Sequence, residues 1–279
     1  MSPRIRASLL AALFFVMLFA LQTPSQAEEK VLKMATTTST NDTGLLDYLA
    51  PMFKKDTGIE LQWVSVGTGQ ALTLGRNCDV SVLLVHDPDA EKTFMDGGFG
   101  VQRKAVMYND FVIVGPETDA AGIKGRTAAE AMKAIAGKQA RFFSRGDKSG
   151  THMKELSLWK TAGLPQPDKE PWYASTGQGM MAVVRMAAEQ KGYTVVDRGT
   201  YIAYASTFKD KPPVVPLVEG DAALFNPYSV IAVNPAKCSG ATYDLAMAFI
   251  NWITSAKGQQ AVRDFRMMGK PLFIPNAQS

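Results

Sequence analysis

Hydrophobic and polar positions follow one another along the first part of the chain in patterns that predict strands and helices by turns. Ile59–Val66 alternates apolar and polar residues and is rich in β-forming side chains, which predicts a strand. Asp79–Val85 is an almost continuous apolar run, typical of a buried parallel strand. Leu45–Phe53 instead carries apolar residues at helical spacing. This alternation of strands and helices predicts an α/β fold with parallel strands.

The same kinds of pattern continue to the end of the chain. Further strands are predicted at Val106–Tyr108, Phe111–Val114, Arg141–Phe143, Trp172–Tyr173, Tyr193–Asp197, Val214–Val218 and Tyr228–Asn234. Further helices are predicted at Thr127–Gly137, His152–Ala162, Met180–Glu189, Arg198–Ala205, Thr242–Thr254 and Ser255–Phe265. The helix that begins at Thr127 opens with a capping-box pattern. A chain of 279 residues is long for one small domain and suits two.

The first residues have the pattern of a secretory signal. Arg4 and Arg6 precede the apolar run Ala7–Leu21, which is shorter than the about 20 residues that span a bilayer. Ser25-Gln26-Ala27 then offers the small residues that a signal peptidase reads. Residues 1–27 are therefore predicted to be a cleaved signal peptide, and the mature protein is expected in the periplasm. An uncleaved N-terminal anchor is the alternative.

Composition and charge narrow the choice of partners. The chain is 46% hydrophobic and 20% charged, which is ordinary for a soluble globular protein. Without Arg4 and Arg6, 28 lysines and arginines face 26 acidic residues, so the mature protein is nearly neutral. Binding to nucleic acid or to a membrane surface receives no support from this balance. Export makes a disulfide between Cys78 and Cys238 chemically possible, but sequence alone cannot pair them.

Small polar loops recur where a predicted strand ends and a helix begins. They are Thr37–Asn41, Gly67–Gln70, Arg145–Thr151 and Ser175–Gly179. A helix start leaves backbone N–H groups without partners and attracts anions. One helix cap requires one hydroxyl residue, and the five hydroxyl residues at 36–40 exceed that requirement. Because open α/β sheets bind ligands beyond the carboxyl ends of their strands, we expect these loops to meet in a cleft between two lobes.

The loops offer hydroxyls, backbone N–H groups and one arginine, a set of donors that fits a compact anion. The candidate oxyanion-binding residues are Thr37, Thr38, Ser39, Thr68, Gly69, Arg145, Ser149, Thr151, Thr176 and Gly177. Arg145 can supply a forked pair of donors. Its alternative role is a surface ion pair with Asp147 or Glu155. Asp147 in turn could orient Arg145, or accept the proton of a ligand such as hydrogen phosphate.

Enzymatic chemistry finds little support in the sequence. His86 and His152 have no metal-ligand spacing with other histidines or cysteines, and His86 is expected to cap or pack at a strand end. Gly67-Thr68-Gly69 lacks the third glycine of a dinucleotide fingerprint, and no serine lies in a nucleophile elbow. We therefore predict a protein that is not an enzyme and that carries no metal and no cofactor.

Taken together, the polar loops and the segments around them resemble the tungstate-binding periplasmic proteins of ABC importers, the TupA-like family. The resemblance is carried by Thr36–Thr40, Asp42–Leu46, Val66–Leu72, Leu83–His86, Ser144–Asp147, Ser149–His152, Asp197–Tyr201 and Asn226–Tyr228. It covers nearly the whole mature chain in order. The family's Thr-Thr-Thr-Ser motif falls on Thr36–Ser39, and its arginine falls on Arg145.

The resemblance implies a two-lobed α/β periplasmic binding protein of type II, in which each lobe is a mainly parallel sheet flanked by helices. Two crossovers would join lobe I, residues 28–110 and 223–279, to lobe II, residues 111–222. The implied protein is a monomer that holds tungstate in the interlobe cleft and delivers it to an ABC permease, without inserting into the membrane after cleavage. Molybdate is a second possible ligand, and the alternative is a phosphate-type oxyanion-binding protein or sensor on the same fold.

The resembled fold also bears on the two cysteines. In that fold the strand Tyr228–Asn234 re-enters lobe I and runs antiparallel beside the third strand, Asp79–Val85. Cys78 precedes the third strand and Cys238 follows the later one, so the resemblance implies that both lie at the same edge of the sheet. A disulfide is expected on this basis, with two separate buried thiols as the alternative.

Overall fold

The computed structural model describes residues 30–277. The predicted signal peptide, residues 1–27, lies outside the described residues, as do the last two residues of the chain. Within the described range, no helix has the length and apolar character that crossing a membrane requires.

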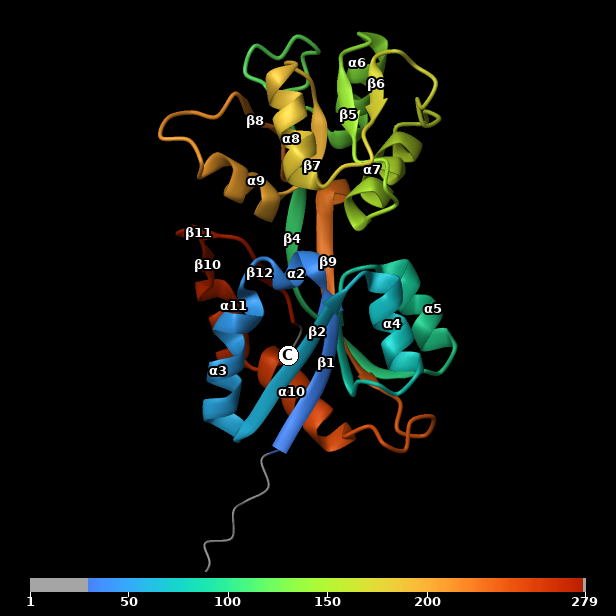
Figure 1. Ribbon diagram of the computed structural model, residues 1–279, viewed down its shortest axis with the longest axis vertical. Coiled ribbons are helices and arrows are strands. Elements are labelled where there is room, and N and C mark those ends of the chain that lie inside the picture. Colours follow the sequence, from blue (N-terminus) through green and yellow to red (C-terminus); the bar gives the residue numbers. More distant parts are fainter. Residues whose placement is uncertain (1–29, 278–279) are drawn as a thin grey trace, which may run out of the picture. The chain divides into compact units, whose positions relative to one another are not determined.

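The lower group of strands in Figure 1 follows the order β12-β4-β9-β3-β1-β2. Its members are β1 (Lys30–Thr37), β2 (Ile59–Val66), β3 (Val82–Val85), β4 (Gly100–Pro116), β9 (Phe225–Val233) and β12 (Ile274–Pro275). β1 and β3 are parallel, whereas β9 is antiparallel to both β3 and β4. The antiparallel position of β9 beside β3 confirms the topology that the resemblance implied.

β4 is longer than predicted. The apolar runs Val106–Tyr108 and Phe111–Val114 were expected to be separate strands, but they belong to one strand of 17 residues. The two polar residues between the runs, Asn109 and Asp110, pair with Asn226 and Phe225 of β9, so the backbone stays extended there. A sequence pattern of two runs therefore concealed a strand that continues from one group of strands into the other (Figure 1).

The upper group of strands forms around the second half of β4. β7 (Thr194–Asp197) and β8 (Val214–Val218) pair with it in antiparallel orientation. β5 (Phe142–Ser144) is parallel to β6 (Tyr173–Ser175), and a parallel bridge joins Phe142 to Tyr193, next to β7. The lower group is thus a mixed sheet, whereas the upper group combines the antiparallel pairs of β4 with the separate parallel pair of β5 and β6.

Helices flank both groups of strands. They are α2 (Thr38–Asn41), α3 (Leu45–Thr57), α4 (Thr68–Arg76), α5 (Pro88–Asp96), α6 (Ala128–Gly137), α7 (Gly150–Thr161), α8 (Met180–Glu189), α9 (Arg198–Ala205), α10 (Tyr243–Thr254) and α11 (Ala256–Asp264). Short elements complete the fold: a 3-10 turn at Ala222–Leu224, β10 (Arg266–Met267) and β11 (Lys270–Pro271). The predicted bounds of α8, α9 and β8 are confirmed to the residue, and so is the capping box of α6 between Thr127 and Glu130.

Two principal cores follow the two groups of strands. One contains Leu32, Phe53 and Phe249, and apart from Ile202 it draws only on residues 32–107 and 228–273. The other contains Phe142, Trp159 and Tyr193, and it draws on residues 111–224. The chain therefore enters the first core, leaves it along β4 and returns to it along β9, which makes a two-lobed α/β structure.

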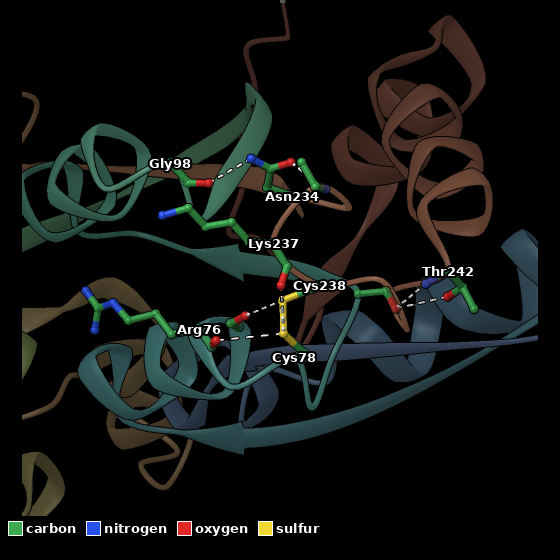
Figure 2. The surroundings of a disulfide bond; sticks show 10 residues. Arg76, Cys78, Gly98, Asn234, Lys237, Cys238 and Thr242 are labelled. Atoms are coloured by element: carbon green, nitrogen blue, oxygen red, sulfur yellow. Dashed lines mark hydrogen bonds between the residues drawn. A yellow bond between two sulfur atoms is a disulfide. The ribbon is translucent and has the colours of Figure 1, made fainter.

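A disulfide joins Cys78 to Cys238, with their Cα atoms 5.4 Å apart, as the resemblance implied. Figure 2 shows that it links the loop before β3 to the loop after β9. The Arg76 and Lys237 carbonyl oxygens lie 3.8 and 3.9 Å from the Cys78 sulfur; a disulfide sulfur has no proton, so these are contacts and not hydrogen bonds. Asn234 fastens the second loop by donating to the Gly98 carbonyl at 2.8 Å.

Removing the disulfide should destabilise the protein without affecting a ligand in the cleft. The bond closes a loop across a sequence separation of 160 residues, and neither cysteine lines the cavity described below. We expect the Cys78→Ser/Cys238→Ser variant to lose about 2–4 kcal/mol in the free energy of unfolding, measured by urea denaturation. The unreduced wild-type protein should show no free thiol after denaturation. Equal urea midpoints for the two proteins would contradict the expectation.

Candidate functional site

The candidate site is a cavity of about 490 Å³ between the starts of several helices. Of the residues predicted from the sequence, seven line it: Thr37, Thr38, Ser39, Thr68, Arg145, Ser149 and Thr151. They come from β1, from the starts of α2, α4 and α7, and from the loop after β5 that carries Arg145, so segments far apart in the sequence face one space. Gly69, Thr176 and Gly177 are not part of the wall.

Thr176 and Gly177 instead support the loop that carries Arg145. The Thr176 backbone N–H and hydroxyl both donate to the Ser144 carbonyl, at 3.0 and 2.9 Å. The Gly177 N–H donates to the Arg145 carbonyl at 2.8 Å. The start of α8 reaches the cavity a little further along the chain, through Gly179–Met181.

The first wall is the hydroxyl motif at the end of β1. Thr37 is the N-cap of α2, and its Oγ1 accepts the Thr40 N–H at 3.2 Å. Thr36 points away from the cavity and donates to the Leu84 carbonyl at 2.8 Å, which locks β1 to β3. Thr38 and Ser39 are exposed. Thr36 therefore has a purely structural role, Thr37 both caps α2 and lines the cavity, and Thr38 and Ser39 line the cavity.

The opposite wall is the start of α7 with Arg145. Arg145 lines the cavity, and its Nε and Nη2 donate to one oxygen of Asp147 at 3.1 and 2.5 Å. The other Asp147 oxygen accepts the Ser149 N–H at 3.0 Å. Burial works to raise the pKa of Asp147, but the hydrogen bonds from Ser149 and Arg145 outweigh it and hold the pKa below its ordinary value. Arg145 thus lines the cavity and pairs with Asp147, which fixes one edge of its guanidinium.

The turn between Ser144 and Asp147 depends on a glycine. Gly146 has φ +64°, and its N–H donates to the Ser144 hydroxyl at 3.2 Å. A Cβ at this position would lie 2.0 Å from the Ser175 hydroxyl oxygen, so a larger residue would displace that hydroxyl and strain the backbone. The glycine lets the loop fold tightly against β6 and directs Arg145 toward the cavity wall.

A buried carboxylate lies behind this loop. Glu155, which was considered from the sequence as a surface partner of Arg145, is only 2% exposed. It accepts hydrogen bonds from Trp159 Nε1 at 3.1 Å and from the Tyr173 hydroxyl at 2.8 Å. Burial raises the pKa of Glu155, and hydrogen bonds from Ser144, Tyr173 and Trp159 offset this only in part. The carboxylate therefore holds the underside of the Arg145 loop and does not face the cavity.

Sequence reasoning missed part of the cavity floor. His86, Asn109, Asp197, Asn226 and Tyr228 all line it. Apart from Asn109, they lie in segments that carried the resemblance, which was the available signal. Asn109 and Asn226 are register partners in β4 and β9, so the floor is built from the two long strands.

His86 does pack at a strand end, as expected, but it also faces the cavity. Its ring stacks on Tyr228 with centroids 4.7 Å apart. Burial lowers the pKa of His86, which favours the neutral imidazole. Within residues 30–277, no group of three or more histidines, cysteines and carboxylates is arranged to hold a metal ion. The site offers hydrogen-bond donors and one arginine instead.

A two-lobed α/β chain whose two long strands form the floor of a cleft, with helix starts as its walls, has the architecture of a periplasmic binding protein. A model of the PBP superfamily domain matches residues 24–257. The chain belongs to the TupA family of tungstate-binding proteins.

The relatives cover most of the chain. It is 48% identical over 241 residues to the tungstate-binding protein TupA of Campylobacter jejuni, across 86% of this chain and 89% of that protein. It is similar to the structure of the tungstate-binding protein TupA of Desulfovibrio alaskensis G20, with 58% identity, a TM-score of 0.88, and coverage of 89% of this chain and 100% of that one. A structure described as the tungstate ABC transporter of Geobacter sulfurreducens is 52% identical with a TM-score of 0.72, over 85% of this chain and 99% of that one. The curated relative and the first of these structures are thus named as binding proteins.

The raised pKa of Glu155 predicts a specific dependence of stability on pH. Because the folded pKa lies above the unfolded value, ionised Glu155 costs stability at neutral pH, and the cost disappears as pH falls through the folded pKa. Relative to Glu155→Gln, the wild-type protein should therefore gain stability as pH falls from 7 through the raised pKa of Glu155 toward the ordinary value of 4.5, by at most about 1.4 kcal/mol per pH unit.

Glu130→Gln is the matched control for this measurement. Hydrogen bonds from Thr127 lower the pKa of Glu130, so its contribution has the opposite sign and is lost as pH falls. Urea denaturation of the three proteins at several pH values would compare them. A difference between wild type and Glu155→Gln that stays constant over this range would refute the assignment of a raised pKa.

Proposed function

We propose that this protein is a periplasmic solute-binding protein that captures tungstate in the cleft and delivers it to an ABC permease. The observation that carries the proposal is the convergence of the hydroxyl motif Thr37–Ser39, the start of α7 and Arg145 on one cavity. This donor set lies in a chain that is 58% identical to a protein named as tungstate-binding. Tungstate, a compact tetrahedral dianion, accepts hydrogen bonds and donates none.

Helix starts suit such a ligand for an electrostatic reason. The first N–H groups of α7 have no partners within the helix, and the helix dipole places partial positive charge at the same end. Ser149 caps α7 by accepting the His152 N–H, and Gly150 and Thr151 line the cavity beside it. We infer that the α7 N–H groups and Arg145 neutralise the dianion together, while Thr38, Ser39 and Thr68 complete its hydrogen bonds. Gly69 was also predicted to donate its backbone N–H, but it does not line the cavity, so it has the least support among the proposed donors.

Two carboxylates beside the cleft, Asp147 and Asp197, accept hydrogen bonds from the protein itself. Asp147 is held by Arg145 and Ser149. Asp197 accepts from the Thr200 N–H and hydroxyl, both at 2.8 Å. A protonated oxyanion such as hydrogen phosphate needs an acceptor for its own proton, whereas tungstate needs none, and the protein's own donors take up part of the accepting capacity of these two carboxylates. This arrangement favours a fully deprotonated dianion over phosphate.

The remaining features of the proposal are those of a transport component. Residues 1–27 would be removed on export to the periplasm, and the mature protein would act as a monomer without inserting into the membrane. Residues 28–110 and 223–279 would form lobe I, and residues 111–222 would form lobe II, with hinges where β4 and β9 cross between them. We propose no enzymatic activity and no cofactor, because the donors of the cavity suit a ligand that is bound and released unchanged.

Calorimetric titration of the mature protein tests the proposed ligand. Tungstate should bind most tightly, and phosphate should bind far more weakly at pH 7, because hydrogen phosphate, unlike tungstate, needs an acceptor for its own proton in a site built mainly of donors. Molybdate has nearly the same size and charge, so it is expected to bind as well and serves as the internal comparison. Phosphate binding that is tighter than tungstate binding would contradict the proposal.

Substitution of Arg145 tests the assignment of the site. Arg145→Glu should abolish tungstate binding, because it replaces a charge-assisted donor with a repelling carboxylate. Arg145→Lys keeps the charge but loses the forked geometry, and we expect an affinity about tenfold lower.

Lys138→Glu is the control, since Lys138 is exposed at the end of α6 and the change in charge is the same. It should bind tungstate like the wild type in the same titration. If Arg145→Glu retained wild-type affinity, Arg145 would lie outside the site.

A further inference from the structure

A chain of hydrogen bonds connects the hydroxyl motif to both long strands under the cleft. His86 Nε2 lies 3.0 Å from Thr37 Oγ1 and 3.2 Å from Ser39 Oγ. On the other side of the ring, His86 Nδ1 lies 2.9 Å from Asn226 Oδ1. Asn226 Nδ2 then donates to Asn109 Oδ1 at 2.7 Å. The chain thus runs from the end of β1 through His86 to β9 and β4.

The chemistry of the groups sets the direction of this chain. An amide oxygen can only accept, so the proton of neutral His86 is on Nδ1 and is donated to Asn226. Nε2 is then an acceptor, which a hydroxyl of Thr37 or Ser39 satisfies. With its oxygen turned toward His86, Asn226 must turn its nitrogen toward Asn109. Each donor in the chain therefore determines the orientation of the next group.

The chain ends at a side chain that faces the cavity. Asn109 lines the cavity and is 5% exposed, and its oxygen is occupied by Asn226. Its nitrogen carries two protons, of which at most one can go to the neighbouring Tyr228 hydroxyl. At least one N–H of Asn109 is left for the cavity.

Reversing the orientation would present an oxygen in that place. If Asn226 turned its nitrogen toward position 86, its oxygen would face Asn109. Asn109 would then have to donate to Asn226 and direct its own oxygen at the cavity. A carbonyl oxygen facing a dianion is repulsive. The orientation of these two buried amides therefore decides whether the floor presents a hydrogen-bond donor or an acceptor to the ligand.

We propose that His86 is a positioning residue that acts through Asn226 to hold Asn109 as a hydrogen-bond donor to the bound oxyanion. This inference rests on the proposed oxyanion-binding function and assigns roles to three residues that the loops alone did not suggest. The essential group of His86 is the Nδ1–H, not the nitrogen that meets the hydroxyls.

Two amide substitutions at position 86 separate the two ring nitrogens. His86→Asn places an amide nitrogen near the site of Nδ1, so it can still donate to Asn226. His86→Gln places its amide near the site of Nε2, so it can meet the hydroxyls of Thr37 and Ser39 but does not hold Asn226. In calorimetric titration with tungstate, we expect His86→Gln to lose about tenfold in affinity and His86→Asn to stay within about threefold of wild type.

A coupling measurement shows whether the effect passes through Asn109. Asn109→Ala should weaken binding about tenfold by removing the donor, and adding His86→Gln to it should weaken binding no further. Thermal unfolding of the ligand-free variants checks that they fold. A loss of stability that His86→Asn and His86→Gln have in common does not affect the comparison of their affinities.

The outcomes distinguish the inference from the proposed function. If wild-type protein binds tungstate but His86→Asn loses as much affinity as His86→Gln, the Nδ1 role is overturned. If the losses from His86→Gln and Asn109→Ala multiply in the double variant, His86 does not act through Asn109 and the inference fails. Wild-type protein that binds no oxyanion would overturn the proposed function itself.

Discussion

The antiparallel pairing of β4 with β9 is the constraint on which the rest of the structure depends. The two strands pair from Gly100 with Val233 to Asp110 with Phe225, and they bring together segments more than a hundred residues apart in the chain. β3 pairs with β9 on the side away from β4, while β7 and β8 pair with the second half of β4. The ladder thus packs into the first core, its two strands lead on into the second core at Phe111 and Leu224, and its upper end supplies the floor of the cleft.

Helix α7 connects the walls of the cleft to this ladder. Its first turn lines the cavity, and one turn later Lys154 donates from Nζ to the carbonyls of Ala223 and Phe225, at 3.1 and 3.0 Å. The side chain also lies over the Phe111 ring. Burial lowers the pKa of Lys154, and two backbone carbonyls and an aromatic face take the place of a carboxylate partner. A displacement of the start of α7 would therefore act, through Lys154, on the segment at Ala223–Phe225 where the chain crosses between its two cores.

The cleft illustrates how a protein selects an anion with few charges of its own. Arg145 contributes positive charge, and Asp147 takes part of it away while fixing the orientation of the guanidinium. The proposed preference for a dianion then depends on neutral donors, namely backbone N–H groups, hydroxyls and amides, whose orientation is set by partners behind them. Glu155, buried behind the Arg145 loop, and His86, half-buried in the floor itself, are titratable groups in those supporting positions.

The local order of strands and helices was determined by the sequence itself, because apolar periodicity and helix caps act within a few residues. The capping box at Thr127 and the bounds of α8 and α9 are examples. The same local logic found most of the cavity wall, since a hydroxyl or glycine at a helix start leaves donors exposed wherever the helix lies. Only the tertiary structure decided that β4 continues through Asn109 and Asp110, because its extended backbone there depends on pairing with distant residues of β9. The composition of the cavity floor was likewise decided only by the tertiary structure. The roles of His86, Asn109 and Asn226 arise from long-range contacts that no local sequence pattern contains.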